Sequence, residues 1–596
     1  MIVPMKKVTI LCIESCQDAT LEHLRRLGLM HIDPVRASEG EFIDKARKDL
    51  EYVRCALEIL PHRPHVTPSG HTAPQIVSAL WKLIHERREC EEELQDLRHE
   101  EARIAPLGSF DLAGIHDLAR NGLMVRIFQI DSHRELPQLP GVVVQELSRD
   151  KTARIFALLA KEVPPVDGQE IRLPEKSLRE VRTRIAELEN LLEKNRAYAA
   201  AFGGDYPAVA ALAGEAEEQV RFLEIRTGMG TAGRVVYLRG YCPQREVPRI
   251  RKAARQDGWG LFIETPGETD SVPTLMDNPA WVRPIRTVFD MIGISPGYNE
   301  VDVSAVFLIF LSLFFAMLVG DAGYGAIFLG LTLWVRRTKP GVPPHAIHFL
   351  LLMSGSTILW GVLTGTLFGM ARLPAVLQSF KVDWLDNTSH VMGLCFLIGS
   401  VHLTLAHVWN FWRNRRTLQA LAQIGWIAIT WAMYFTASAM VLNRVFPKAG
   451  YGLFGGGIVL VILFMTPPAK FKEEWFNHAM LPLNLVSSFV DVVSYIRLFA
   501  VGTASLAVAQ AFNQMAIGDG INGFLHGVLA ALVLFLGHAL NIILSVMGVI
   551  VHGVRLNTLE FSGHLGMQWT GIPYQPFSRI LPPETAGVSV PIPVKQ

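Results

Sequence analysis

Residues 482–560 read PLNLVSSFVDVVSYIRLFAVGTASLAVAQAFNQMAIGDGINGFLHGVLAALVLFLGHALNIILSVMGVIVHGVRLNTLE, two long apolar segments around a short polar turn at Gly518–Asn522. A helix of about 35 residues would reach roughly 50 Å, whereas the hydrocarbon core of a bilayer is about 30 Å thick. We therefore expect two transmembrane helices that tilt steeply or project from the membrane.

Each segment carries an arginine, Arg497 in SYIRLFA and Arg555 in HGVRL. A charge inside an apolar span is costly and usually marks an ion path. On the second segment, a stripe of about 100° on a helical wheel collects His538, Asn541, Ser545, His552 and Arg555. On the first segment, a broad polar face collects Asn484, Ser487, Asp491, Ser494, Tyr495, Ser505 and Asn513. Arg497 lies about 120° from Asp491 on that wheel, so we interpret it as facing another subunit or a water cavity.

The 596 residues divide into a charged half and an apolar half, although 50% are hydrophobic and 19% charged overall. Apolar runs dominate from Val303 onward, which indicates a soluble domain followed by a polytopic membrane domain. A net charge of +1 argues against nucleic-acid binding. The six cysteines form no CxxC pair, which is typical of reduced cytoplasmic thiols. A strand-like run directly follows Met1–Lys7, so no signal peptide is predicted.

The soluble half is expected to contain two α/β lobes. A small βαβ unit is predicted from a strand at 7–14, a helix at 18–27 and a strand at 30–35, and a further helix spans about 41–60. Strand-like runs at 123–130, 142–147 and 153–159 predict one lobe, and the pattern at 235–242, 247–256 and 261–264 predicts a second.

Two heptad series predict an antiparallel coiled-coil hairpin, which we interpret as a rigid strut. The first consists of Leu80, Leu83, Cys90, Leu94, Leu97 and Ile104, and the second of Leu178, Val181, Ile185, Leu188, Leu192, Ala199 and Phe202. No GxxxxGK[ST] loop occurs, and no GxGxxG follows a strand, so this half is predicted to bind no nucleotide.

The apolar half is predicted to hold eight transmembrane segments, at about 303–319, 322–335, 346–368, 389–412, 418–443, 453–466, 481–516 and 523–557. With both ends inside, the predicted outer loops carry four basic residues: Arg372, Lys381, Arg444 and Lys448. The predicted inner loops carry eight: Arg336, Arg337, Lys339, Arg413, Arg415, Arg416, Lys470 and Lys472. This bias fits the positive-inside rule and places the amino-terminal half in the cytoplasm.

Three further features leave alternatives open. The motif GDAGYG, with Asp321, Gly323 and Tyr324, puts a carboxylate at a membrane boundary, as a packing turn or as an ion site. Glu560 is expected at the inner boundary, where it could collect protons or snorkel to the surface. The histidine pairs His345/His348 and His402/His407 have no carboxylate or cysteine at ligand spacing, so no metal site is predicted.

Together these residues resemble the a-type stator subunit of rotary V-type and A-type ATPases, called subunit I in bacteria and archaea. The resemblance spans essentially the whole chain. Its motifs are Met5-Lys6-Lys7-Val8, Gly28-x-Met30-His31-Ile32, Pro273-Thr274 with Asn278-Pro279, Gly320-Asp321-x-Gly323-Tyr324-Gly325, Ser494-Tyr495-Ile496-Arg497-Leu498-Phe499-Ala500, Gly537-His538-x-Leu540-Asn541, His552-x-x-Arg555-Leu556, Glu560-Phe561 and Pro576-Phe577. After Arg555 this chain departs from the usual family pattern. Here the run Leu556–Phe561 is followed by a weakly charged stretch, residues 562–574.

The resemblance implies a non-hydrolytic subunit that packs its last two tilted helices against a rotating ring of ion-carrying subunits. Arg497, with Arg555 close in register, would separate two half-channels and favour the ionised ring carboxylate. The candidate half-channel groups are Asp491, Ser494, His538, Asn541, His552 and Glu560. Other implied partners are peripheral stalk subunits, membrane lipid and possibly the adaptor between ring and central stalk; no cofactor is implied.

The expected organisation is therefore a cytoplasmic stator arm at 1–290, an α-helical transmembrane domain at 291–577 and a cytoplasmic tail at 578–596, in a prokaryotic cell membrane. The alternative from another class is a secondary transporter that uses intramembrane arginines to bind its substrate. A transporter predicts internal repeats and discontinuous helices, and the two halves of the apolar region show no repeat. A passive membrane scaffold would not explain two arginines on overlong helices.

Overall fold

The computed structural model describes residues 1–579 apart from 62–65, 108–111, 138–139, 150–152, 162–165, 174–175, 268, 340, 371–373, 468–470, 519 and 521–522. The chain divides into two compact units. The membrane unit comprises Met1–Val8, Tyr241–Arg251 and Ile263–Pro576, and the arm unit comprises Thr9–Gly240, Lys252–Phe262 and the chain from Phe577. The proposed division at residues 290 and 577 stays a prediction. Arg372, Lys470 and the tail from 580 lie outside the described residues.

A five-stranded sheet combines strands from both ends of the first 264 residues. Its order is β2-β8-β1-β9, with β7 paired to β8. The elements are β1 (Met5–Ile13), α1 (Gln17–Leu27), β2 (His31–Asp33), β7 (Gly230–Ala232), β8 (Val235–Pro243), α7 (Val247–Asp257) and β9 (Gly260–Glu264). The sequence predicted the first βαβ unit and the later one separately. Two or three short strands alone bury little apolar surface, so the strands of these two predicted motifs form one shared sheet.

A second, four-stranded sheet interrupts the predicted coiled coil. Its order is β4-β5-β3-β6, and β3 pairs with β5 in antiparallel register, with Phe128 opposite Phe156. The elements are α4 (Leu112–Arg120), β3 (Met124–Asp131), β4 (Val143–Arg149), β5 (Ala153–Ala160) and β6 (Gln169–Ile171). The lobe predicted from the three strand-like runs is therefore confirmed.

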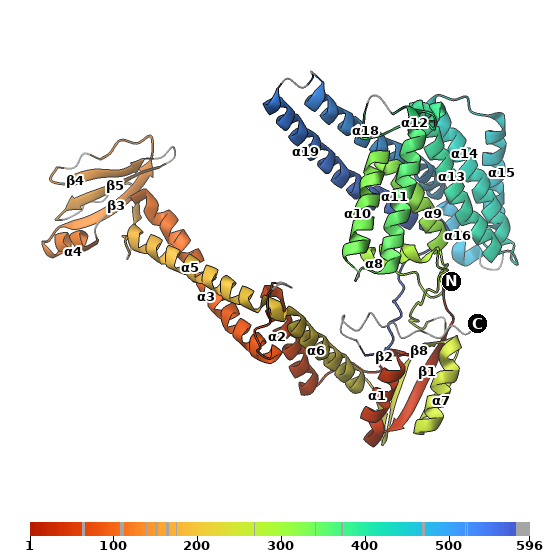
Figure 1. Ribbon diagram of the computed structural model, residues 1–596, viewed down its shortest axis with the longest axis horizontal. Coiled ribbons are helices and arrows are strands. Elements are labelled where there is room, and N and C mark those ends of the chain that lie inside the picture. The colour runs from red at the N-terminus through yellow and green to blue at the C-terminus, as the bar shows by residue number, and fades with distance from the viewer. Residues whose placement is uncertain are drawn as a thin grey trace. The chain divides into compact units, whose positions relative to one another are not determined.

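Two long helices, α3 (Ala73–Ile104) and α5 (Leu178–Ala201), run side by side and lead to this lobe (Figure 1). Capping boxes at Thr72 and Ser177 begin both helices. The predicted heptad residues from Cys90 to Ile104 form one buried cluster with Val181, Ile185 and Leu188. A third helix, α6 (Tyr206–Thr227), packs on α2 (Glu41–Ile59) and was not predicted. Its buried residues, Val209, Ala213, Val220 and Ile225, do not keep one heptad register.

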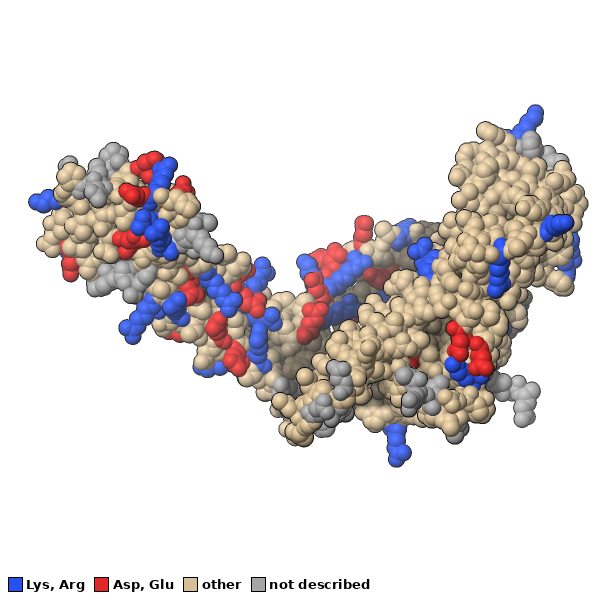
Figure 2. Space-filling view, turned by 90° about the horizontal axis from the view of Figure 1, so that it is seen from above, with Lys and Arg blue, Asp and Glu red and all other residues tan. Residues whose placement is uncertain are grey.

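Charges of both signs cover the α3–α5 part of the arm unit, as Figure 2 shows. They are paired between the two helices: Arg184 with Glu93 at 2.9 Å, Arg182 with Glu101 at 2.7 Å and Arg98 with Glu189 at 2.8 Å. These ion pairs join α3 to α5 on the solvent side, while apolar residues fill the seam between the two helices. Each exposed pair contributes little alone, about 0–1 kcal/mol, so the seam supplies most of the stability.

The membrane unit is helical from residue 286 on. Its helices are α8 (Arg286–Ile292), α9 (Ser304–Val319), α10 (Ala322–Thr338), α11 (Pro344–Thr364), α12 (Ala375–Gln378), α13 (Thr388–Arg413), α14 (Gln419–Leu442), α15 (Lys448–Phe464), α16 (Phe471–Ala479), α17 (Leu481–Ser494), α18 (Ile496–Ile517), α19 (Phe524–Gly548) and α20 (Ser562–Leu565). Helices occupy all eight predicted segments. Among the described residues, five are long and apolar enough to cross a membrane: α11, α13, α14, the continuous stretch Leu481–Ile517 and the stretch Phe524–Leu565. Helices α9 and α15 are shorter apolar helices.

Small residues let these helices approach closely, as is typical of membrane packing. On α14 and α15, a Cβ added at Gly425 would lie 2.7 Å from the carbonyl oxygen of Gly457, and one added at Gly457 would lie 2.8 Å from that of Gly425. On α13, Gly399 makes room for the ring of Tyr495. The same close packing therefore fixes the junction between α17 and α18.

The last long helix is not a regular α-helix. Two π-helical turns, Val549–Gly553 and Leu556–Phe561, follow α19 before the single turn of α20. A π-turn inserts an extra residue and rotates everything after it relative to an α-helical wheel. The stripe predicted from His538 to Arg555 therefore does not continue past residue 548.

Candidate functional site

The helix break at Tyr495 positions Arg497. Tyr495 is fully buried between α17 and α18, and its hydroxyl lies 2.9 Å from Nδ1 of His402 on α13. Two residues later, Nε of Arg497 donates to the carbonyl of Ser494 at 3.0 Å. This bond directs the Arg497 guanidinium back toward the helix break at Tyr495, where it can also reach the last helical turns of the chain.

Arg497 and Glu560 form an ion pair between the two long segments. Nη2 of Arg497 lies 2.7 Å from Oε1 of Glu560, and Nε of Arg555 lies 3.6 Å from the same oxygen. The Glu560 side chain is 5% exposed, whereas Arg497 is 24% and Arg555 55% exposed. The second carboxylate oxygen, Oε2, is buried and has no hydrogen-bond partner among the described residues. Two arginines thus contact one carboxylate.

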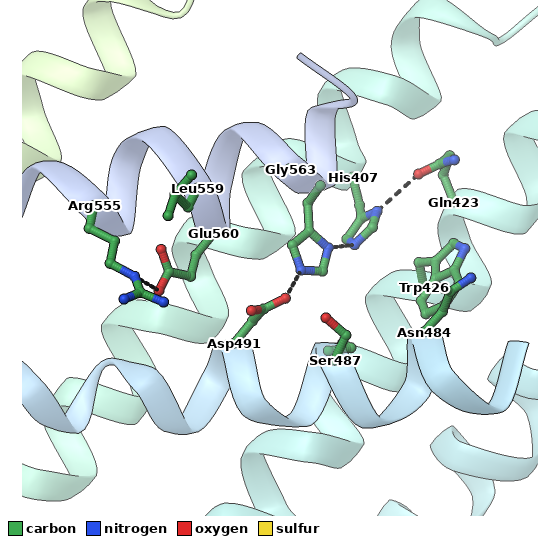
Figure 3. A pocket seen from close by; sticks show the side chains of 12 residues that line it. His407, Gln423, Trp426, Asn484, Ser487, Asp491, Arg555, Leu559, Glu560 and Gly563 are labelled. Carbon is green, nitrogen blue, oxygen red and sulfur yellow. Dashed lines mark hydrogen bonds and ion pairs between the residues drawn. The ribbon is translucent and has the colours of Figure 1, made fainter. Parts of the chain in front are cut away.

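A polar cavity of about 470 Å³ adjoins this pair (Figure 3). It lies between α13, α14, α17 and the last turns of the chain. Its lining consists of His407, Gln423, Trp426, Asn484, Ser487, Ser488, Asp491, Arg555, Leu559, Glu560, Gly563 and His564. Asp491 and Glu560, both predicted as half-channel groups, therefore line the same cavity; their role stays a prediction.

A chain of hydrogen bonds crosses one side of the cavity. Oδ2 of Asp491 lies 3.1 Å from Nε2 of His564, whose Nδ1 lies 3.0 Å from Nε2 of His407. Nδ1 of His407 in turn lies 2.9 Å from Oε1 of Gln423. Figure 3 shows Asp491, His407 and Gln423 on this side of the cavity, with the hydrogen bonds of the chain as dashed lines. The carbonyl of His564 also accepts from Asn410 at 2.8 Å.

A second polar network lies between α18 and α19, along the part of α18 that follows Arg497 in the sequence. The Tyr324 hydroxyl lies 2.7 Å from Nδ1 of His538 and accepts from Nδ2 of Asn541 at 2.9 Å. Nε2 of His538 lies 3.1 Å from Oδ1 of Asn513. Ser505 contacts Oδ1 of Asn541 at 3.3 Å and Ser545 at 3.0 Å. The predicted residues His538 and Asn541 therefore meet in one network with Tyr324.

Asp321 acts through the backbone. Its Oδ1 accepts from the amides of Gly323 at 2.7 Å, Tyr324 at 3.3 Å and Phe368 at 2.9 Å, and its Oδ2 accepts from that of Gly369 at 3.1 Å. The side chain is thus an N-cap of α10 that also binds the loop after α11. Of the two alternatives that the sequence left open, this geometry favours the packing turn.

Ser494 and His552, the two remaining predicted half-channel residues, make fewer contacts with the two polar regions. The Ser494 hydroxyl donates to the carbonyl of Asp491 at 2.7 Å, within its own helix. His552 lies in the first π-helical turn and is partly exposed, with no hydrogen bond to the described residues. The stripe that grouped His552 with His538 is interrupted before it reaches His552, so the two histidines belong to different surroundings.

Comparisons with known proteins place the chain in a family. A protein of Borreliella burgdorferi named "V-type ATP synthase subunit I" is 30% identical over 616 residues, which cover 97% of this chain and 100% of that protein. The chain belongs to the V-type ATP synthase subunit I family. "V-type ATP synthase subunit I 1" of Treponema pallidum is also 30% identical, over 97% of this chain and 100% of that protein. "A-type ATP synthase subunit I" of Methanocaldococcus jannaschii is 25% identical, over 68% and 64%.

Two further comparisons add little. No family model matches the chain. The solved cytoplasmic N-terminal domain of a V-ATPase subunit I matches 44% of this chain at 17% identity, with a TM-score of 0.23 that is too low to establish a shared fold. The family resemblance inferred from the sequence motifs is nevertheless confirmed by the full-length relatives. This subunit I chain is a membrane subunit of a rotary V/A-type ATPase.

Several members of this subunit I site were not predicted from the sequence. His407, Gln423 and His564 line the cavity, and Tyr495 marks the helix break before Arg497, but none of the four was proposed as functional. One signal was available: His564 follows Glu560 by four residues, so the two would share a helical face. Asn513 was noted only as part of a broad polar face, and its partner His538 could not be inferred from either helix alone.

Proposed function

We propose that this chain is the static ion-translocating subunit of the rotary ATPase and that Arg497 separates two half-channels. The observation that carries the proposal is the Arg497–Glu560 pair beside a polar cavity, on two overlong apolar helices. A ring of subunits, each with an ion-binding carboxylate, would pass the exposed side of α18 and α19.

Arginine suits this role because its charge persists. Its pKa is above about 12, so Arg497 stays cationic where a lysine could lose its proton. A fixed cation favours the ionised form of a nearby ring carboxylate and thereby releases its ion. Because Arg497 is 24% exposed and shares Glu560 with Arg555, part of its guanidinium remains accessible to a carboxylate from the ring.

The two polar regions support the two half-channels. The cavity around Asp491 and Glu560 lies where α17 begins and α13 ends, which the basic loops assign to the inner side. The network of Tyr324, His538 and Asn541 lies toward the other ends of α18 and α19. An ion reaching Arg497 from one region has to transfer to the ring before it can leave by the other.

The arm unit supports a second role, as the link to peripheral stalks. Its α3–α5 hairpin is long, ends in a small β-lobe and is braced by ion pairs across the seam. Such a strut can resist torque at a distance from the membrane. The amino-terminal arm is accordingly proposed to be cytoplasmic, in a prokaryotic cell membrane, with the ring adaptor as a further contact.

Ion pumping driven by ATP, measured in vesicles with the assembled complex, tests the proposal. We expect Arg497→Ala to abolish pumping and to raise passive ion leakage, because the barrier between half-channels is lost. Arg497→Lys should retain part of the activity and lose it as pH rises, since a lysine can be neutralised. The matched control is Arg337→Ala, an exposed arginine at the end of α10, which should pump normally. Normal pumping by both Arg497 variants in an assembled complex would refute the role and favour a scaffold or transporter.

A further inference from the structure

In the hydrogen-bond chain from Asp491 to Gln423, the number of bound protons depends on the direction of the hydrogen bonds. Both ring nitrogens of His407 and both of His564 lie within 3.1 Å of a partner. A neutral imidazole donates with one nitrogen and accepts with the other, and only an imidazolium donates with both. The direction of each bond therefore fixes the direction of the next.

With Oε1 of Gln423 facing His407, the chain carries one extra proton. Nδ1–H of His407 donates to Gln423, so its Nε2 accepts from Nδ1–H of His564. Nε2 of His564 then faces the Asp491 carboxylate at 3.1 Å. That contact is a hydrogen bond only when a proton lies between the two groups, on His564 or on Asp491.

The same side chains satisfy every bond without the proton once the Gln423 amide turns over. The amide N–H then donates to His407, His407 donates to His564, and His564 donates to the ionised carboxylate of Asp491. Loaded and unloaded states therefore differ by one proton, by the rotation of one neutral amide and by the ring nitrogen of His407 that carries its proton, which is Nδ1 in the loaded state and Nε2 in the unloaded state. No side chain has to leave the cavity wall.

We propose that Asp491, His564 and His407 hold and release one proton at the wall of the cavity. Gln423 ends the hydrogen-bond chain, and its amide can turn to donate to His407 or to accept from it. The inference rests on the proposed function, since the held proton would be one that travels through the inner half-channel. In loading, a hydronium ion in the cavity gives one proton to the cluster and becomes water; the Nε2 proton of His407 passes to Nδ1 of His564, Nδ1 of His407 becomes protonated, and the Gln423 amide turns its oxygen toward it. In release, the cluster returns one proton to cavity water on the side that faces Glu560.

The surroundings favour a proton over a metal cation. All four imidazole nitrogens are occupied by hydrogen bonds, so none offers a free lone pair to a metal. Histidine is also the side chain whose charge changes most readily near neutral pH. The titratable and charged groups around the cluster are His402 and His407 on α13, Asp491 on α17, Arg497 on α18, and Arg555 and Glu560 on the last turns; α14 contributes the neutral Gln423.

Burial protects the cluster from bulk exchange while the cavity gives it access. His407 is 4% exposed, and the side chains of His564 and Asp491 are 13% and 24% exposed. Ser488, 1% exposed, lines the same cavity with a buried hydroxyl that has no partner among the described residues. A buried polar group without a protein partner is usually satisfied by water, which a proton needs for its passage.

The test is the pH profile of the initial rate of ATP-driven proton uptake in vesicles with the assembled complex. The variants are His564→Asn and Gln423→Glu, and His348→Asn on the exposed face of α11 is the matched control. We expect His564→Asn to pump about tenfold more slowly at the alkaline end, where loading limits the rate. Gln423→Glu should shift the decline to higher pH by about one unit, since a carboxylate only accepts and stabilises the loaded state.

A second measurement does not depend on pumping. In the full-length chain in lipid nanodiscs, labelled with ¹⁵N-histidine, we expect a doubly protonated imidazole signal at low pH that His564→Asn removes. Unchanged pH profiles in both variants, with Arg497→Ala inactive, would overturn the inference and leave the proposed function standing. Normal pumping by Arg497→Ala would overturn the proposed function, and with it the half-channel role of the cluster. A His564 ring that stays neutral at every pH, together with an Asp491 carboxyl that stays ionised in a ¹³C-aspartate-labelled sample, would overturn proton holding itself.

Discussion

Replacing Glu560 by glutamine should reveal how strongly the two arginines depend on it. Glu560→Gln keeps the shape of the side chain and removes its charge, which leaves Arg497 without its ion pair at 2.7 Å. Removing one partner of a fully buried pair costs about 3–5 kcal/mol, whereas exposed pairs contribute about 0–1 kcal/mol. Because Arg497 is 24% exposed and Glu560 5% exposed, we expect a coupling of about 2–3 kcal/mol.

A double-mutant cycle isolates this coupling. The cycle uses Arg497→Gln, Glu560→Gln and the double variant, with the free energy of unfolding of the full chain measured by denaturant titration in mixed micelles. A parallel cycle with Arg555→Gln should give less than about 1 kcal/mol, because Arg555 is 55% exposed and 3.6 Å away.

An exposed pair on the arm provides the baseline. Arg88 and Glu92 lie 3.0 Å apart, with side chains 80% and 68% exposed, so their cycle should give a coupling near zero. Equal coupling for Arg497 and Arg555, or a value for Arg497 no larger than this baseline, would refute the conclusion that burial makes Arg497–Glu560 the dominant pair.

Three further substitutions or modifications test other parts of the structure. Asp321→Ala should lower the unfolding free energy by about 3 kcal/mol or more, because several backbone amides lose a charged acceptor; a loss under about 1 kcal/mol would contradict the cap. Gly399→Ala should lower it by about 1–3 kcal/mol, since the new methyl would lie 2.5 Å from the Tyr495 ring; thermal unfolding measures it. Maleimide at about pH 8 should label the exposed Cys16 first, because the thiolate is the reactive form. Burial raises the pKa of the Cys242 thiol to about 12, so it stays protonated there, and early labelling of Cys242 would contradict its burial.

Periodicity predicted the elements that depend on one apolar stripe. The heptad residues of α3 and α5 are buried where the sequence placed them, and the eight apolar segments are helices. In both cases the pattern is visible in a local window, as a heptad stripe in the arm helices and as continuous apolar length in the membrane segments. The sharing of one sheet by β1 and β8 was not predictable in this way, because strand order is set by partners far apart in sequence.

The partner of Arg497 was not predictable for a related physical reason. A helical wheel assumes a regular helix, and the long segments are interrupted by the break at Tyr495 and by two π-helical turns. Each interruption rotates the residues that follow it. The wheel therefore placed Arg497 away from every carboxylate on its own helix and carried no information about Glu560, which comes from the other segment.

The positions of the polar groups along the chain give Arg497 its place between two separate regions. Asp491 precedes Arg497 by six residues, or roughly 9 Å of helix, and Asn513 follows it by sixteen, or roughly 24 Å. Between these regions lie Tyr495 and Leu498, which belong to the main apolar core and leave little room for a continuous water path. Under the proposed function, an ion that moved between the regions within this chain would have to pass Arg497 and Arg555, whose guanidinium groups contact one carboxylate. Passage by way of a carboxylate on a partner that travels past α18 and α19 would avoid that barrier.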